Sequence, residues 1–247
     1  MIKAQNVTIG YGSTEVLKDV SMTAGEGEVV TIIGGSGTGK STLLRAIMNL
    51  IPIKAGRIFI EDSRTDNLKE SDMNEVRKKM GMVFQEGALF DSMNVFENVA
   101  FALRRHTKKK EKEIREIVED RLEAVNMQGR EKKMPSELSG GMRRRVGIAR
   151  ALAMHPMILL YDEPTTGLDP ILTNTVTELI LKMRDRYKTT SVIVTHDMRV
   201  ADRVSDRLYM IHDGAFIAEG TPDELRRSGD ERLHAFLGVA GQASGQE

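Results

Sequence analysis

The chain has 247 residues, 40% of them hydrophobic and 29% charged, which is enough for a full hydrophobic core without disulfides. Its 36 basic and 36 acidic residues cancel, so there is no electrostatic basis for wrapping nucleic acid, and the lack of cysteine excludes thiolate metal sites. No apolar run approaches the roughly 20 residues that span a bilayer, and residues 1–6 lack the apolar stretch of a signal peptide. We therefore expect a globular protein, compatible with the cytoplasm, that reaches a membrane only through a partner.

The first third of the chain predicts two kinds of β structure. Residues 2–30 alternate short β-prone runs with glycine turns, as in a small antiparallel sheet. Val29–Ile33 has the length and β-branching of a buried strand, and it leads through a glycine-rich turn into a helix from Lys40 to about Leu50. Two further strands are expected at Ile58–Ile60 and Met82–Phe84.

The remainder of the chain begins with a helical, charged stretch from about Val95 to Ala153. Strands then alternate with helices: strands at Ile158–Tyr161, Ser191–Thr195 and Leu208–Ile211, and helices around Leu172–Arg186 and Met198–Val204. This alternation predicts an α/β fold with a parallel sheet covered by helices on both faces, into which the helical stretch is inserted. We expect one domain over residues 1–238, with a helical subdomain at about 92–154, and a flexible tail at 239–247.

The inserted stretch contains a highly charged segment at Lys108–Met127. Its apolar residues Ile114, Val118 and Leu122 recur at helical spacing. This pattern favours a surface helix with one buried stripe over a patch that binds lipid or nucleic acid.

A phosphate-binding loop follows the first buried strand. Lys40 can neutralise β- and γ-phosphate oxygens, Ser41 can ligate Mg²⁺ and Thr42 can reach an α-phosphate. Glycines let the backbone N–H groups of such a loop curl around a β-phosphate. The strand before it and the helix after it favour this interpretation over a glycine-rich turn without a ligand. The run that fits the pattern G-x-x-x-x-G-K-[ST] is Gly34, Gly35, Ser36, Gly37, Thr38, Gly39, Lys40 and Ser41.

Two acids end the apolar strand that starts at Ile158. Carboxylates at the carboxyl end of a parallel strand lie where such sheets bind their ligands. Asp162 would hold Mg²⁺ directly or through water, and Glu163 would act on the attacking water as a general base or by orienting it. Acids at a strand end are a weak signal alone, but they become specific after a phosphate loop in the same chain.

Three single residues are also candidates, each with a simpler structural alternative. Gln85 follows a predicted strand and can coordinate Mg²⁺ or position water, although a lone glutamine is usually a surface residue. His196 also follows a strand, where it can hydrogen-bond a γ-phosphate, although most single histidines are not catalytic. Tyr11 can stack on adenine, although a tyrosine before Gly12 is also an ordinary turn residue.

The run Leu138–Met142 carries a second anion-binding pattern. Ser139, Gly140 and Gly141 open a helix, and they supply backbone N–H groups, a hydroxyl and a helix N-terminus. Since the chain already has a phosphate loop, a second anion site indicates half of a shared site and a protein that works in pairs.

In this order, these motifs resemble the nucleotide-binding subunit of ABC transporters, over nearly the whole chain from Tyr11 to Leu225. The resemblance implies a P-loop NTPase (RecA-like) core with an N-terminal antiparallel β-subdomain and a helical insertion. It implies catalytic roles for Glu163, His196, Gln85 and Lys40, and metal ligation by Ser41, Gln85 and Asp162. The motifs are Walker A at Gly34–Ser41, the Q-loop at Gln85, the signature at Leu138–Met142, Walker B ending at Asp162 and Glu163, the D-loop at Gly167, Leu168 and Asp169, and the switch histidine His196.

The resemblance also implies a mechanism. Two copies pair head to tail around two ATP molecules, so that Walker A of one copy faces Ser139 and Gly141 of the other. Closure of the pair pulls on an integral-membrane permease at the cytoplasmic face of the inner membrane. Met142 departs from the glutamine of most of the family, which removes any polar contact from that side chain. We expect Ser139 and the backbone groups to preserve phosphate recognition.

One branch of the family is resembled more closely than the others. Phe84–Val99, Arg104–Thr107 and Met134–Glu137, together with Met142, are similar to the ATPase of bacterial Mla-type phospholipid transporters. That branch implies an MCE-family lipid-binding protein and a small regulatory subunit as partners, and no lipid site in this chain. The apolar run Ala88–Phe90 is equally explained by core packing.

Three rival functions share part of this pattern. The ATPase of a polar amino-acid or other small-solute importer has the same catalytic motifs, but it usually lacks the Gly-Ala-Leu-Phe run of residues 87–90. Soluble ABC ATPases of DNA repair or translation usually need a long coiled-coil insertion or two cassettes in one chain, and this sequence has neither. A G-protein-like switch would not explain the run Leu138–Met142.

Overall fold

A six-stranded sheet forms the centre of the protein. The computed structural model describes residues 1–228, 230, 232 and 233, so the predicted tail at 239–247 lies outside the described residues. The strand order is β10-β9-β3-β8-β7-β6. Five strands are parallel, as the strand–helix alternation predicted: β3 (Val29–Ile33), β6 (Met80–Val83), β7 (Ile158–Asp162), β8 (Thr190–Thr195) and β9 (Arg207–His212).

The edge strand β10 (Ala215–Gly220) runs antiparallel to β9 and was not predicted. Asp213 and Gly214 connect the two strands and both have positive φ, of 49° and 77°. Two successive left-handed residues are typical of the tight hairpin turn that matches the twist of antiparallel strands.

A second, antiparallel sheet is built from the first part of the chain, as expected. Its strand order is β2-β1-β4-β5. The predicted strand at Ile58–Ile60 belongs to this sheet and not to the parallel one. The four strands are β1 (Ile2–Tyr11), β2 (Thr14–Ala24), β4 (Ala55–Ile60) and β5 (Ser63–Arg64).

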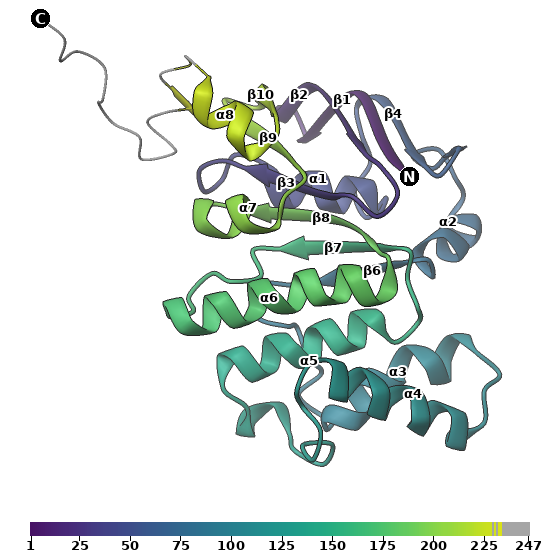
Figure 1. Ribbon diagram of the computed structural model, residues 1–247. Coiled ribbons are helices and arrows are strands. Elements are labelled where there is room, and N and C mark those ends of the chain that lie inside the picture. Colours follow the sequence, from purple (N-terminus) through teal and green to yellow (C-terminus); the bar gives the residue numbers. More distant parts are fainter. Residues whose placement is uncertain (229, 231, 234–247) are drawn as a thin grey trace, which may run out of the picture.

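The core lies on both faces of the parallel sheet (Figure 1). Alternation along β7 divides its side chains, so that Ile158 and Leu160 join one cluster while Leu159 and Tyr161 join the other. The first cluster packs the antiparallel sheet and α1 (Lys40–Ile47) against the parallel sheet. The second packs the opposite face against helices that include α6 (Pro170–Tyr187) and α7 (Met198–Val204).

The inserted stretch forms a group of helices below the sheet in Figure 1. Ile114, Val118 and Leu122 are buried on one side of α4, which confirms the predicted surface helix with one buried stripe. The limits of the domain and subdomain remain predictions. No described helix is both long and apolar enough to cross a bilayer. The inserted elements are α3 (Val95–His106), α4 (Glu111–Ala124), the short 3-10 helix η1 (Pro135–Glu137) and α5 (Gly140–Leu152).

Two further helices and one helix end differ from the prediction. The helices α2 (Glu70–Arg77) and α8 (Pro222–Arg227) were not expected. Helix α1 ends at Ile47, short of the expected Leu50, because Asn49 adopts a left-handed φ of 50° and the N–H of Leu50 donates to the carbonyl of Arg45. This pattern satisfies backbone carbonyls that would otherwise lack a hydrogen-bond partner at the end of a helix.

Candidate functional site

The register of the parallel strands brings the predicted motifs to one edge of the sheet. Ile33 at the end of β3 is opposite Thr195 of β8, and Asp162 at the end of β7 is opposite Val194. Since parallel strands point the same way, the residues that follow them emerge together. These residues include Gly34, Glu163 and His196.

The phosphate loop wraps around the side chain of Lys40. Only 5% of this residue is exposed, and its ammonium group donates to the carbonyls of Gly34 at 2.9 Å and Gly35 at 2.8 Å. Gly39 has a φ of 98°, and a Cβ there would lie 2.8 Å from Val16 of β2. Helix α1 starts directly after the loop, so its N-terminal N–H groups and dipole favour an anion at this position.

Two of the three predicted metal ligands lie in contact. The Ser41 hydroxyl donates to Oδ1 of Asp162 at 2.6 Å, and Asp162 is 9% exposed. A hydroxyl and a carboxylate are the hard oxygen donors that Mg²⁺ prefers, with phosphates and water completing its shell. The third, Gln85, is exposed in the loop after β6, and among the described residues its backbone carbonyl alone is hydrogen-bonded, to Arg144.

Glu163 lies at the centre of the cluster. Its Oε2 is 2.9 Å from His196 Nδ1 and accepts a hydrogen bond from the Thr166 hydroxyl at 2.9 Å, while Oε1 is 3.5 Å from Lys40 Nζ. The backbone of Glu163 has a φ of 49°, a conformation that costs about 1 kcal/mol for a residue with a side chain. Three residues that were predicted to be catalytic, Lys40, Glu163 and His196, therefore converge.

The signature residues form a separate, exposed helix start. Ser139 is the N-cap of α5, where its hydroxyl accepts from the N–H of Met142 at 3.3 Å. Its carbonyl accepts from the N–H of Arg143, and in the described part of the chain Ser139 forms no hydrogen bond with the phosphate loop. The Met142 side chain packs against the hydrophobic core, which explains an apolar residue at that position.

The remaining two candidates lie at turns. Asp169 is the N-cap of α6, where its Oδ1 accepts from the N–H groups of Ile171 and Leu172, both at 2.9 Å. Tyr11 ends β1 with 51% of its surface exposed, a position compatible with either stacking or an ordinary turn.

Sequence reasoning missed two residues that join the motifs. The Thr166 hydroxyl donates to Glu163, as described above. Arg144 is 6% exposed, and it donates to the backbone carbonyls of Gln85 and Thr166. Burial lowers the pKa of the Arg144 guanidinium. The run of arginines at 143–145 is typical of a solvated helix face, and its sequence gives no sign that the middle one is buried.

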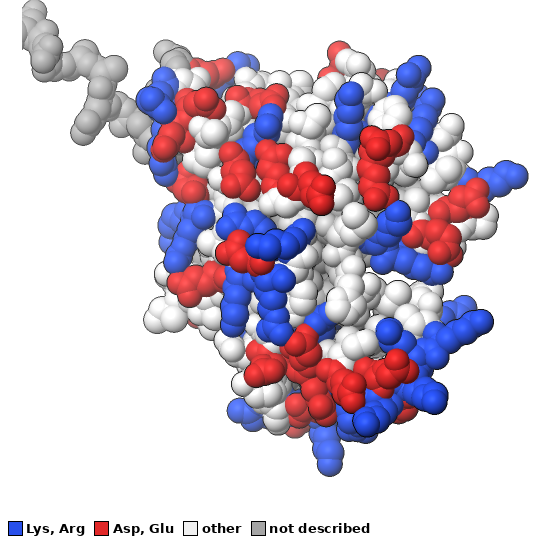
Figure 2. Space-filling model, turned by 45° about the vertical axis from the view of Figure 1, so that its right-hand side comes forward, with Lys and Arg blue, Asp and Glu red and all other residues white. Residues whose placement is uncertain are grey.

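Charge on the surface is mixed. On the face in Figure 2, Lys and Arg side chains alternate with Asp and Glu. This face therefore has no extended field of one sign, the feature that attracts a nucleic acid backbone.

Comparison with known proteins decides the family. The family model described as "ABC transporter" matches residues 17–166. The chain belongs to this family. It is 41% identical over 236 residues to the probable ribonucleotide transport ATP-binding protein mkl of Mycobacterium tuberculosis, covering 96% of this chain and 66% of that one. It is 40% identical over 237 residues to the intermembrane phospholipid transport system ATP-binding protein MlaF of Haemophilus influenzae, covering 96% and 90%.

A solved structure supports the same assignment. The dimeric, post-hydrolysis ATP-binding cassette MJ0796 bound to ADP and Pi superposes with a TM-score of 0.82 at 33% identity, covering 90% of this chain and 99% of that one. The expected P-loop α/β fold is thus confirmed, and the chain is an ATP-binding cassette of the ABC transporter family. It spans slightly less than two thirds of the length of the mycobacterial relative.

Replacing Lys40 by Ala should weaken ATP binding to the free chain about 10- to 100-fold, because one charge-assisted contact to phosphate is lost. Titration calorimetry measures this directly. Lys182→Ala, an exposed lysine of α6, is the matched control and should bind as the wild type does. Unchanged affinity in Lys40→Ala would contradict the assignment of this loop.

Proposed function

We propose that this chain is the ATP-hydrolysing subunit of a bacterial transporter, and that it acts as a head-to-tail pair in which each ATP lies between two copies. One observation carries the proposal. Lys40, Asp162, Glu163 and His196 converge in one cluster, whereas Ser139, the exposed residue at the start of α5, forms no hydrogen bond with these four residues in the described part of the chain. A second anion-binding surface that is separate from the first is explained if it completes the site of a partner.

The cluster can carry out hydrolysis with a clear division of roles. Lys40 leaves its two loop carbonyls to neutralise the β- and γ-phosphates of bound ATP. Glu163, hydrogen-bonded to His196 and Thr166, orients or deprotonates the attacking water, and His196 contacts the γ-phosphate. Ser41 and Asp162 would hold Mg²⁺, which neutralises charge that develops on the phosphate oxygens. Gln85 would reach this shell from its exposed loop.

The signature residues of one copy would recognise phosphate mainly through backbone N–H groups. Ser139 and the N–H groups of Gly140 and Gly141 would bind the γ-phosphate of the ATP held by the partner. Two anion-binding surfaces repel each other without that phosphate between them, so its loss on hydrolysis releases the pair. Asp169, at the start of α6, lies beside this interface in the proposed pair.

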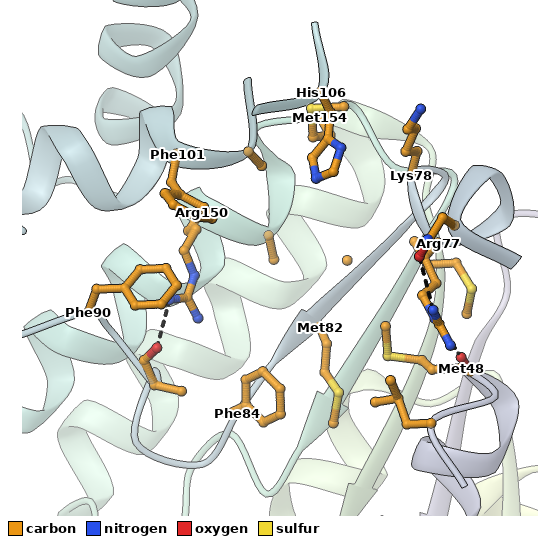
Figure 3. Close-up of a pocket in the computed structure, with 17 residues that line it drawn as sticks. Met48, Arg77, Lys78, Met82, Phe84, Phe90, Phe101, His106, Arg150 and Met154 are labelled. Atoms are coloured by element: carbon orange, nitrogen blue, oxygen red, sulfur yellow. Dashed lines mark hydrogen bonds between the residues drawn. The ribbon is translucent and has the colours of Figure 1, made fainter. Parts of the chain in front are cut away.

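A groove beside the active site is suited to the permease. It has a volume of about 500 Å³ and lies between β6, α2, α3 and α5 (Figure 3). Its lining is largely apolar, with the polar side chains of Asn74, Arg77, Lys78, His106 and Arg150 among the apolar ones. Phe84, Phe90 and Phe101 are 37%, 42% and 41% exposed there, which is unusual for such large apolar side chains. Phe84 directly precedes Gln85, so a membrane partner seated in this groove would contact the catalytic loop.

Phospholipid is the substrate class that we favour. The relative named for intermembrane phospholipid transport is matched over 90% of its length, whereas the one named for ribonucleotide transport is matched over 66%. The residues shared with Mla-type ATPases, above all the run at 87–90, support the same choice. The proposal includes an MCE-family lipid-binding protein and a small regulatory subunit as partners, and a place at the cytoplasmic face of the inner membrane. Transport of ribonucleotides or another small solute is the alternative.

The transported substrate can be tested on the intact complex. The chain, purified from its native membrane with the proteins bound to it, is reconstituted in lipid nanodiscs and its ATPase rate is measured. We expect a permease and an MCE protein to copurify, and phospholipid to stimulate the rate while ribonucleotides do not. Stimulation by a ribonucleotide or an amino acid would contradict the lipid assignment.

Glu163→Gln should preserve ATP binding, slow turnover by about 10²- to 10⁴-fold and trap the ATP-bound pair. The amide keeps the size of the side chain, but it cannot accept a proton. Gel filtration with ATP should show a dimer. A variant that stays monomeric and hydrolyses at the normal rate would exclude Glu163 from this role.

Ser139→Arg should leave ATP affinity of the free chain unchanged and abolish hydrolysis, since the substitution obstructs the partner's site. Ser136→Arg, an equally exposed position of η1 outside the signature, is the matched control and should retain activity. Weaker ATP binding by the isolated Ser139→Arg chain would argue that the site is not shared.

A further inference from the structure

The buried guanidinium of Arg144 is an unusual feature of the signature helix. Arginine is rarely this buried unless a carboxylate accompanies it. In the described part of the chain Arg144 forms no ion pair, and its hydrogen bonds go to two main-chain carbonyls. Nε donates to Gln85 at 2.7 Å, and Nη2 donates to Thr166.

These two carbonyls belong to the loops that carry the chemistry. Gln85 is the residue that would reach the metal and the attacking water. Thr166 is bonded at its backbone to Arg144 and at its hydroxyl to Glu163, at 2.9 Å. The guanidinium is therefore linked to Glu163 through a single residue, Thr166, and it also binds the backbone carbonyl of Gln85.

Arg144 also lies close to the start of its own helix. A Cβ on Gly140 would lie 3.6 Å from Arg144 Nη1, so the guanidinium lies beside the first turn of α5. The planar group with its fixed fork of donors thus joins two loops that are far apart in sequence, and it does so beside the start of the signature helix. The flexible ammonium group of a lysine lacks this planar fork, so it would not hold two carbonyls of different loops in one fixed geometry.

We propose that Arg144 is a positioning residue for hydrolysis, which holds the Gln85 loop and the Glu163–Thr166 segment in the arrangement that turnover requires. The inference rests on the proposed function of the cluster as an ATPase site. It assigns to Arg144 no contact with the nucleotide. Loss of the Arg144 side chain should therefore lower the rate at which bound ATP is hydrolysed and leave the affinity for ATP unchanged.

Arg150 provides a matched comparison on the same helix. It donates to the carbonyls of Gly87 at 2.9 Å and Ala88 at 2.7 Å, two and three residues after Gln85. Figure 3 shows the second of these bonds. Neither of these bonds reaches the Glu163–Thr166 segment. Arg150→Met thus removes an arginine that holds the same loop, but it leaves the link between the two loops intact.

The experiment compares the full-length wild type with Arg144→Met, Arg144→Lys and Arg150→Met. Steady-state phosphate release gives kcat and KM, calorimetry gives the Kd for ATP, and thermal unfolding gives Tm. For Arg144→Met we expect kcat to fall about 10- to 100-fold, with KM and Kd within about twofold of the wild type. The kcat of Arg144→Lys should fall by a similar factor, because a flexible ammonium group does not hold the two carbonyls in one fixed geometry. Arg150→Met should keep kcat within about twofold.

Two results would overturn the inference. One is a kcat of Arg144→Met or Arg144→Lys equal to that of the wild type. The other is a joint fall of kcat, ATP affinity and Tm that Arg150→Met reproduces, which would indicate a general packing role. Arg144→Lys carries the test alone if Arg144→Met does not fold. A wild-type chain that neither hydrolyses ATP nor forms dimers would instead contradict the proposed function. The ATPase activity and dimerisation of the wild type are therefore measured before any variant.

Discussion

The parallel register of β3, β8 and β7 is the constraint on which the candidate site depends. It places the residues after Ile33, Asp162 and Thr195 at one edge of the sheet, although they come from distant parts of the sequence. The 2.6 Å hydrogen bond between Ser41 and Asp162 is a direct result of this alignment. A shift of one residue in any of these pairings would turn the strand's side chains to the opposite face and separate the two oxygens. The buried, β-branched strands specify the register because both faces of the sheet are packed.

Helix α5 connects this edge to the rest of the molecule. Its first residue follows Ser139, its second turn carries Arg144 and its later turns contact the loop that borders the apolar groove. That contact is backbone against backbone, since a Cβ on Gly147 would lie 2.9 Å from Gly87 Cα. Such close packing transmits displacement and does not absorb it. A membrane protein that moves the groove would therefore move the signature helix and the catalytic loops together.

Much of this arrangement was predictable because the decisive patterns are local. The phosphate loop, the acidic end of β7 and His196 each follow a strand that hydrophobicity alone reveals. The parts that were missed depend on contacts between distant segments. Arg144 lies among three consecutive arginines, and only tertiary packing distinguishes the buried one from its neighbours. Asn49 shortened α1 because a left-handed residue satisfied the free carbonyls of the helix, and the hairpin at Asp213 and Gly214 added an antiparallel edge to the sheet.

The central claim, that each ATP site is shared between two copies, is tested most directly by mixing two inactive chains. Lys40→Ala lacks the phosphate loop lysine, and Ser139→Arg lacks a working signature. In a head-to-tail pair of the two, one site carries both defects and the other carries neither. An equal mixture should therefore recover ATPase activity, up to about a quarter of the wild-type rate, because half of the pairs are mixed and each has one intact site. A mixture as inactive as its components would contradict the shared site.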